Sequence, residues 1–191
     1  MALKFYFDIV FHSDQGEISG PVIANQVMPV LHGAFKKLDG TFALALPNCL
    51  PNRKSGIGNK LRIFTLRLSD INALVSAIKD HFTVRDYCEI TPACEVPEDF
   101  AGPWVEYRRY RPSNKNAERN SDDAQAPLRE RRILTAGEQM LPYFVLRSTT
   151  NQHGFSLIVE PREAQYAETE IVPDSYGLSV SSRSFAVPQL P

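Results

Sequence analysis

The order of hydrophobic patterns in the first half of the chain restricts the fold more than any other feature. Residues 4–11, KFYFDIVF, carry apolar side chains at alternate positions, which predicts a strand with one apolar face. Residues 23–38 carry them at helical spacing instead, and Pro29 predicts a kink or a fresh helical start inside this segment. The chain is therefore expected to open with a strand and a long amphipathic helix.

The next segments predict two more strands, a second helix and a final extended stretch. Residues 41–47 and 60–68 have strand patterns, and a loop rich in Gly, Asn and Pro separates them at 48–59. A helix is predicted over 69–82 with a serine as its N-cap, and residues 84–97 predict extended chain. This β-α-β-β-α-β order is that of a ferredoxin-like, RRM-like domain. Such a domain often binds RNA, but the same fold carries many other functions.

The second half of the chain has a different character. Residues 104–120 are basic and aromatic, and residues 121–127 form a polar break. Residues 127–140, PLRERRILTAGEQM, predict a short arginine-rich helix, and residues 143–160 predict a strand, a polar bend and a second strand.

We therefore predict an α+β fold with a domain boundary near Pro97. Residues 1–96 would form the ferredoxin-like domain. Residues 97–191 would form a C-terminal α+β domain with the short arginine-rich helix and the β-hairpin.

Composition limits the compartment and the partners. Three cysteines form no CxxC pair and no secretory signal opens the chain, so we expect a reduced, cytoplasmic protein. No apolar run approaches the ~18 residues of a membrane helix, so no membrane partner is expected. The net charge of −1 gives no bulk signal for nucleic acid, but residues 105–135 hold eight Lys or Arg against five Asp or Glu. This basic block is either a solvated charge run or an RNA contact.

Two further features allow both an ordinary and a functional interpretation. His32 falls about 130° from the centre of the apolar helical stripe, so it is either a plain surface histidine or a general acid or base. Gly33 beside it leaves room for a ligand to approach. The bend LRSTTNQHGFSL is either a solvated turn or a cluster of hydrogen-bonding groups, with Phe155 in the core or stacked on a base.

No metal or cofactor is expected from the sequence. The four histidines lie far apart, no HxxxH pair joins them, and neither a Walker A motif nor GxGxxG is present.

Four segments, in this order, resemble the CRISPR-associated repeat endoribonucleases of the type I-F branch, which cleave precursor CRISPR RNA at the base of a repeat hairpin. They are VLHGAF, YRRYR, LRSTTNQHGF, and SYGLS followed by SFAVP, and together they cover most of the chain. The resemblance implies a ferredoxin-like domain joined to a second domain with an arginine-rich helix. Here that helix is shorter than is usual in the family and is split by polar residues and Pro127.

The resemblance also implies roles for particular residues. His32 matches the catalytic histidine, Ser148 a serine that holds the 2′-hydroxyl nucleophile, and Tyr176 a tyrosine near the histidine. A gapless register would instead put Lys36 at the catalytic position, but the Leu-His-x-Ala pairing favours His32 and lysine is a poor base near neutrality. The RNA-binding residues that the family match and the basic block indicate are Arg108, Arg109, Arg111, Lys115, Arg119, Arg129, Arg131, Arg132, Thr150 and Phe155.

The implied function is metal-independent cleavage of CRISPR repeat RNA by 2′-hydroxyl attack, giving a 2′,3′-cyclic phosphate and a 5′-hydroxyl. The implied partners are the repeat hairpin and the other subunits of the type I-F surveillance (Cascade) complex, especially the protein that coats the crRNA backbone. Target DNA would be met only through that complex. One alternative is a subunit that binds and caps the hairpin without turnover, and another is a ferredoxin-like module that binds a protein.

Overall fold

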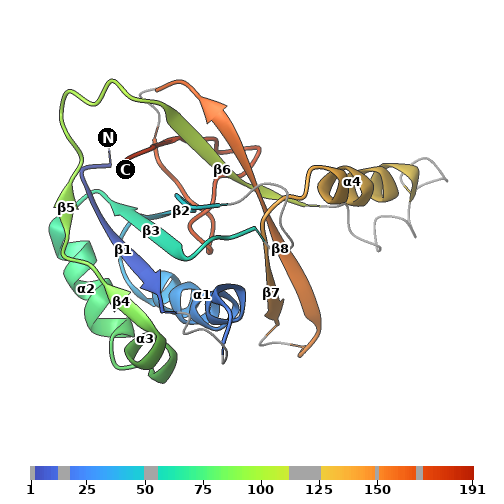
Figure 1. The fold of residues 1–191 in the computed structure, drawn as a ribbon. Helices are drawn as coiled ribbons and strands as arrows, with labels where there is room; N and C mark the ends of the chain where they lie inside the picture. Colours follow the sequence, from blue (N-terminus) through green and yellow to red (C-terminus); the bar gives the residue numbers. More distant parts are fainter. Residues whose placement is uncertain (1–2, 13–17, 50–55, 112–125, 149–150, 167–169) are drawn as a thin grey trace.

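The computed structural model describes residues 3–12, 18–49, 56–111, 126–148, 151–166 and 170–191, and it contains two antiparallel sheets with helices (Figure 1). The α+β class predicted from the sequence is therefore confirmed. Among the described residues, no helix is both long and apolar enough to cross a membrane.

The first sheet has the strand order of a ferredoxin-like fold. Its strands are β1 (Phe5–Phe11), β2 (Phe42–Ala45), β3 (Lys60–Thr65) and β4 (Cys88–Ile90), in the order β2-β3-β1-β4. The short β5 (Cys94–Glu95) also pairs with β1. The predicted strands and their order along the chain are therefore confirmed.

The helices of this half lie against one face of the sheet (Figure 1). α1 (Gly20–Lys37) runs through Pro29 as one helix, so the fresh helical start does not occur. The helix predicted over 69–82 is instead two helices, α2 (Leu68–Ile78) and α3 (Phe82–Tyr87).

The helix ends explain this difference. Arg67, not Ser69, is the N-cap residue of α2, and its guanidinium binds Asp70 in the first turn at 2.9 Å. His81 interrupts the predicted helix because its ring accepts a hydrogen bond from the amide of Thr83 at 3.3 Å and caps α3. The extended chain expected from residue 84 therefore begins only at Cys88.

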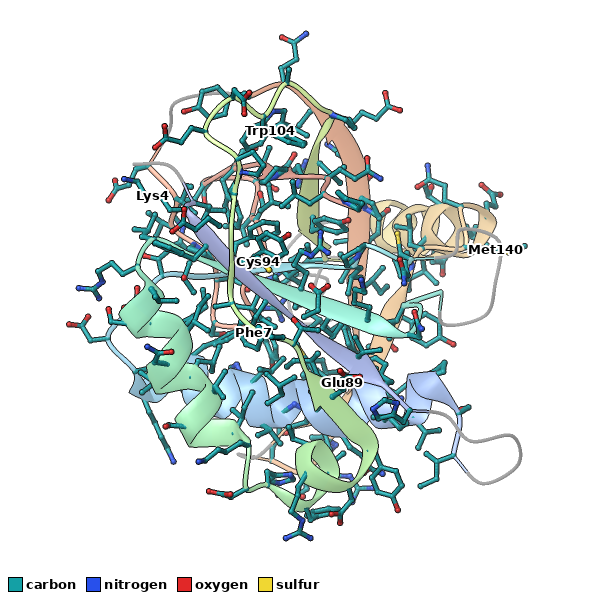
Figure 2. All side chains as sticks on the ribbon, turned by 60° about the vertical axis from the view of Figure 1, so that its left-hand side comes forward. Lys4, Phe7, Glu89, Cys94, Trp104 and Met140 are labelled. Atoms are coloured by element: carbon teal, nitrogen blue, oxygen red, sulfur yellow. The ribbon has the colours of Figure 1, made fainter. Side chains whose placement is uncertain are left out.

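The second sheet is formed by residues of the second half. It contains β6 (Trp104–Tyr110), β7 (Tyr143–Arg147), β8 (Gly154–Ala164) and β9 (Val187–Pro188), in the order β7-β8-β6-β9. The predicted hairpin is confirmed as β7 and β8, whereas β6 and β9 were not predicted. α4 (Ala126–Glu138) projects to one side, with Met140 just beyond its end (Figures 1 and 2).

The two halves share one continuous hydrophobic core, and Phe7 lies near its centre (Figure 2). One face of β1 turns Phe7 and Ile9 toward the helices, where both are fully buried. On the opposite face of β1, Asp8 is buried, whereas Tyr6 and Val10 are only partly buried. The division at residue 97 stays a prediction.

A buried charge cluster occupies that second face. Arg62 on β3 lies directly opposite Asp8 on β1 and donates to both carboxylate oxygens, at 2.7 and 3.0 Å. It also donates to the main-chain oxygens of Leu190 and Pro191 at 2.8 and 2.7 Å, and Lys60 binds Asp8 at 3.0 Å. Burial alone would raise the pKa of Asp8, but the bonds from Arg62 and Lys60 outweigh it and lower that pKa below 3.8.

We predict that Asp8→Asn lowers the free energy of unfolding by about 3–5 kcal/mol, because it leaves two cations uncompensated. Since the folded pKa of Asp8 is below its unfolded value, its contribution is present above about pH 4 and is lost as the pH falls through the folded pKa. Urea unfolding at several pH values measures both effects. Asp86→Asn, which breaks the exposed pair with Arg85, is the control and should change stability little; equal losses for the two variants would contradict the prediction.

Candidate active site

Three segments far apart in the chain meet beside the second half of α1. They are His32 on α1, the turn at residues 174–178, and Arg109 on β6. The rings of His32 and Tyr176 stack with their centroids 4.2 Å apart and their planes only 12° from parallel. The structure thus brings together two of the three residues predicted to be catalytic.

A hydrogen bond to the main chain selects the tautomer of His32. Its Nδ1 lies 2.7 Å from the carbonyl oxygen of Ser175. A carbonyl oxygen only accepts, so Nδ1 carries the proton and Nε2 carries the lone pair of the neutral ring. His32 is half-buried, and its ring orientation is determined by this bond together with the stack on Tyr176. Nε2 is therefore the nitrogen suited to exchange a proton with a substrate.

Asp174 builds the turn that presents Tyr176. Its Oδ1 accepts hydrogen bonds from the amides of Tyr176 and Leu178, at 2.8 and 3.1 Å. Gly177 has a φ of +80°, and a Cβ there would come within 3.0 Å of the Leu44 amide nitrogen. Glycine is therefore required both by the backbone conformation and by the close approach to β2. The amide of Leu44 donates to the Gly177 carbonyl at 2.8 Å and attaches the turn to the edge of the first sheet.

The same aspartate joins the turn to β6. Arg109 binds Asp174 Oδ2 at 3.0 Å, and its guanidinium lies over the Tyr176 ring at 5.0 Å. Burial raises the pKa of the Tyr176 hydroxyl above 10, Asp174 adds to this rise, and Arg109 opposes it. The tyrosine is therefore a neutral phenol near pH 7, suited to packing and hydrogen bonding but not to proton abstraction.

Ser148 and Phe155 lie on the β7–β8 hairpin. Ser148 is half-buried just after β7, and its amide donates to the His153 carbonyl at 2.9 Å across the bend. Phe155 pairs with Leu146 across the hairpin. Its side chain is partly buried against the hydrophobic core. Asn25 on α1 accepts from the Val145 amide at 2.8 Å, which fixes the hairpin to the helix that carries His32. Thr150 lies outside the described residues.

Lys36, the alternative catalytic position on α1, has different surroundings from His32. Lys36 lies one turn beyond His32 and is exposed in the last turn of the helix. A Cβ built on Gly33 would meet no atom within 4 Å, so this part of the helix surface is open beside His32.

The predicted RNA-binding cations divide into three groups. Arg108 and Arg109 lie on β6, and Arg111 follows its end. Lys115 and Arg119 lie outside the described residues. Arg129, Arg131 and Arg132 belong to α4, of which only the backbone is described at these positions.

The structure also shows two site residues that the sequence analysis missed, Asp174 and Ser175. Asp174 is followed three residues later by a glycine, which is typical of a turn in which an aspartate side chain caps backbone amides. Ser175 contributes only its main-chain carbonyl oxygen. Every residue type has this oxygen, so the sequence gives no sign of its role. In the described part of the chain, no group of three or more His, Cys, Asp or Glu side chains is placed to hold a metal ion.

Comparison with known proteins identifies one family. The model of the family described as CRISPR-associated protein (Cas_Csy4) matches residues 6–190, which is nearly the whole chain. A comparison with curated protein sequences gave no significant match.

We predict that, with the ring neutral, His32 carries its proton on Nδ1. Nitrogen-15 NMR of labelled protein at alkaline pH should show a protonated shift for Nδ1 and an unprotonated shift for Nε2. His153, exposed on the hairpin, is the internal comparison. A proton on Nε2 of His32 would show that the bond to Ser175 does not form.

Two glycine substitutions should change stability in opposite directions. Gly177→Ala should lower the free energy of unfolding by about 1–3 kcal/mol, because alanine is strained at a φ of +80° and crowds Leu44. Gly33→Ala should raise it by about 0.5–1 kcal/mol, because alanine favours the helix and the position is open. Denaturant unfolding measures both. A Gly177→Ala protein as stable as the wild type would contradict the role given to the turn.

Proposed function

The chain belongs to the CRISPR-associated Cas_Csy4 family, and from this premise we propose that it is a metal-independent endoribonuclease that cleaves CRISPR repeat RNA at the base of its hairpin. The observation that carries the proposal is the ring pair of His32 and Tyr176, in which the Nδ1 bond to Ser175 leaves Nε2 as the basic nitrogen. This arrangement supplies what RNA cleavage needs from a protein when the RNA itself provides the nucleophile.

The reaction is an internal transesterification. The 2′ oxygen attacks the adjacent phosphorus while Nε2 of His32 accepts the hydroxyl proton. The bond from phosphorus to the 5′ oxygen breaks, and that oxygen leaves with the proton that Nε2 had accepted, which returns His32 to its neutral form. The products are a 2′,3′-cyclic phosphate and a 5′-hydroxyl, and the proton transfer contributes roughly 10²–10⁴ in rate.

Other residues are assigned to holding the substrate. Ser148 would bind the attacking ribose, and alignment of this kind contributes several kcal/mol in favourable cases. Thr150 would contact the RNA backbone and Phe155 would stack near the scissile nucleotide. Arg109 and Arg111 would contact bases below the stem, and the arginines of α4 its phosphates. These roles rest on the family membership, on the hydrogen bond that joins the hairpin to α1, and on the salt bridge that joins β6 to the turn beside His32.

The product is proposed to stay bound. The chain would retain the 3′ hairpin of the mature crRNA and enter the type I-F surveillance complex beside the protein that coats the crRNA backbone. Retention makes the enzyme single-turnover in practice.

A second candidate is a hairpin-binding subunit of the same complex without turnover. It is favoured by the shortness of α4, which has 13 residues to present arginines to a stem. Tight binding of excess repeat RNA with no product would support this candidate.

We predict that the wild-type chain cleaves a repeat hairpin in EDTA and that His32→Ala slows the single-turnover rate by about 10²–10⁴. Lys36→Ala is the matched control, since it removes a cation one turn away on the same helix, and it should cleave at nearly the wild-type rate. Denaturing gels measure the rates, and mass spectrometry identifies the cyclic phosphate.

Two outcomes would refute the proposal. One is a hairpin that remains intact with wild-type protein, and the other is equal cleavage by His32→Ala and wild type. A hairpin with a 2′-deoxyribose at the cleavage point should bind but resist cleavage, because the nucleophile is missing. Cleavage of that RNA would exclude the internal transesterification.

A further inference from the structure

A pocket of about 540 Å³ lies at the C-terminal end of β6 in the second sheet, next to the candidate active site. Its walls come from β6, β8 and the turn at Val180–Arg183. It also includes Arg109 and Asp174, the ion pair beside Tyr176, so it borders the site where the RNA would be cut. A volume of this size suits a small ligand or one or two nucleotides, not a duplex.

The charge of the pocket is strongly positive although the chain as a whole is slightly acidic. Five arginines line it against two carboxylates, a net charge of +3, whereas the chain carries −1. The two carboxylates each hold one arginine, since Asp174 binds Arg109 and Glu160 binds Arg162 at 2.9 Å. Arg108 and Arg183 have no ion-pair partner among the residues that the structure describes. The charges of Arg108 and Arg183 are therefore available to a bound anionic ligand.

The pocket is organised by bonds within the protein. Val180 and Arg183 pair through their main chains, with the Arg183 amide donating to the Val180 carbonyl at 2.9 Å, which places Ser181 and Ser182 at the tip of a tight turn. Arg108 donates to the Ser181 hydroxyl. Glu106 accepts hydrogen bonds from the hydroxyls of Ser179 and Ser184 at 2.5 and 2.9 Å, one on each side of the turn. A ligand would therefore find the turn already in place.

The composition of the walls points to single-stranded RNA. Guanidinium groups and serine hydroxyls, both present in the walls, are good donors to phosphate oxygens. An acidic protein segment would use the charge but not the continuity with the cleavage site through Arg109 and Asp174.

Building on the proposed function, we propose that this pocket binds the single-stranded RNA adjoining the base of the hairpin, with Arg108 and Arg183 on a backbone phosphate and Ser181 positioning Arg108. The segment is either the 5′ or the 3′ flank of the stem, since both continue from its base with the same phosphodiester chemistry. The pocket would extend recognition of the substrate beyond the hairpin itself.

The test compares four RNAs bound to the full chain: a bare repeat hairpin, the hairpin with only a 5′ flank, the hairpin with only a 3′ flank, and a flank alone. Each hairpin carries a 2′-deoxyribose at the cleavage point. One flanked hairpin should bind wild type more tightly than the bare hairpin, and this identifies the flank. Arg183→Ala should lose about tenfold on that RNA and reduce the slope of log K against log salt by about 1. Arg183→Lys should retain part of the advantage, and Arg85→Ala, which removes an exposed arginine on α3, should retain all of it.

The outcomes separate this inference from the proposed function. Equal binding of bare and flanked hairpins, or a flank advantage unchanged in Arg183→Ala, would overturn the proposal that the pocket binds RNA. Hairpin cleavage would still stand, and an acidic protein segment would become the favoured ligand of the pocket. If wild type fails to cleave unmodified hairpin but binds the flank alone in a manner sensitive to Arg183, the proposed function fails and the pocket stands. Arg183 is exposed, and thermal unfolding verifies that its variants are folded.

Discussion

The carboxylate of Asp174 is the contact on which the candidate site depends. One oxygen caps two amides of the turn and the other binds Arg109, so a single side chain joins the C-terminal segment to β6. The turn then provides the Tyr176 ring and the Ser175 carbonyl to His32. Because the same turn is bonded to the edge of the first sheet through Leu44, His32 and its partners are held in one hydrogen-bonded frame. Preorganisation of this kind is what a proton-transfer site requires.

Strand β6 links the features that the fold brings together. The helices lie on one face of the first sheet (Figure 1), and on the other face Arg62 contacts the C-terminal residues Leu190 and Pro191. Asp8 is buried on this face of β1, so its charge needs Arg62 and Lys60 as partners. The arginine pocket lies at the C-terminal end of β6 and borders the site at Arg109. The proposed chemistry and the proposed RNA contacts therefore meet at one strand, β6.

Local patterns predicted most of the fold, and the reasons for the failures are physical. Alternation and helical spacing are local, so the strands and α1 of the first half and the β7–β8 hairpin were predictable. The end of α2 was not, because a histidine side chain acts there as a cap. β6 was not predicted because consecutive arginines interrupt its alternating apolar pattern. Arg109 and Arg108 extend from opposite faces of this strand to the turns near residue 174 and residue 181. Helical spacing singled out His32, and the family resemblance named Tyr176 and Ser148. The Asp174–Arg109 pair joins residues 65 positions apart, and no periodicity shows it.

The most direct test of the account is a structure of the chain bound to a repeat hairpin with a 2′-deoxyribose at the cleavage point. We predict that Nε2 of His32 lies within about 3.2 Å of the position of the 2′ oxygen or of the leaving 5′ oxygen. Nδ1 should keep its bond to Ser175 and the ring its stack on Tyr176. A scissile phosphate held by Lys36, or placed away from the α1 face that carries His32, would contradict the account.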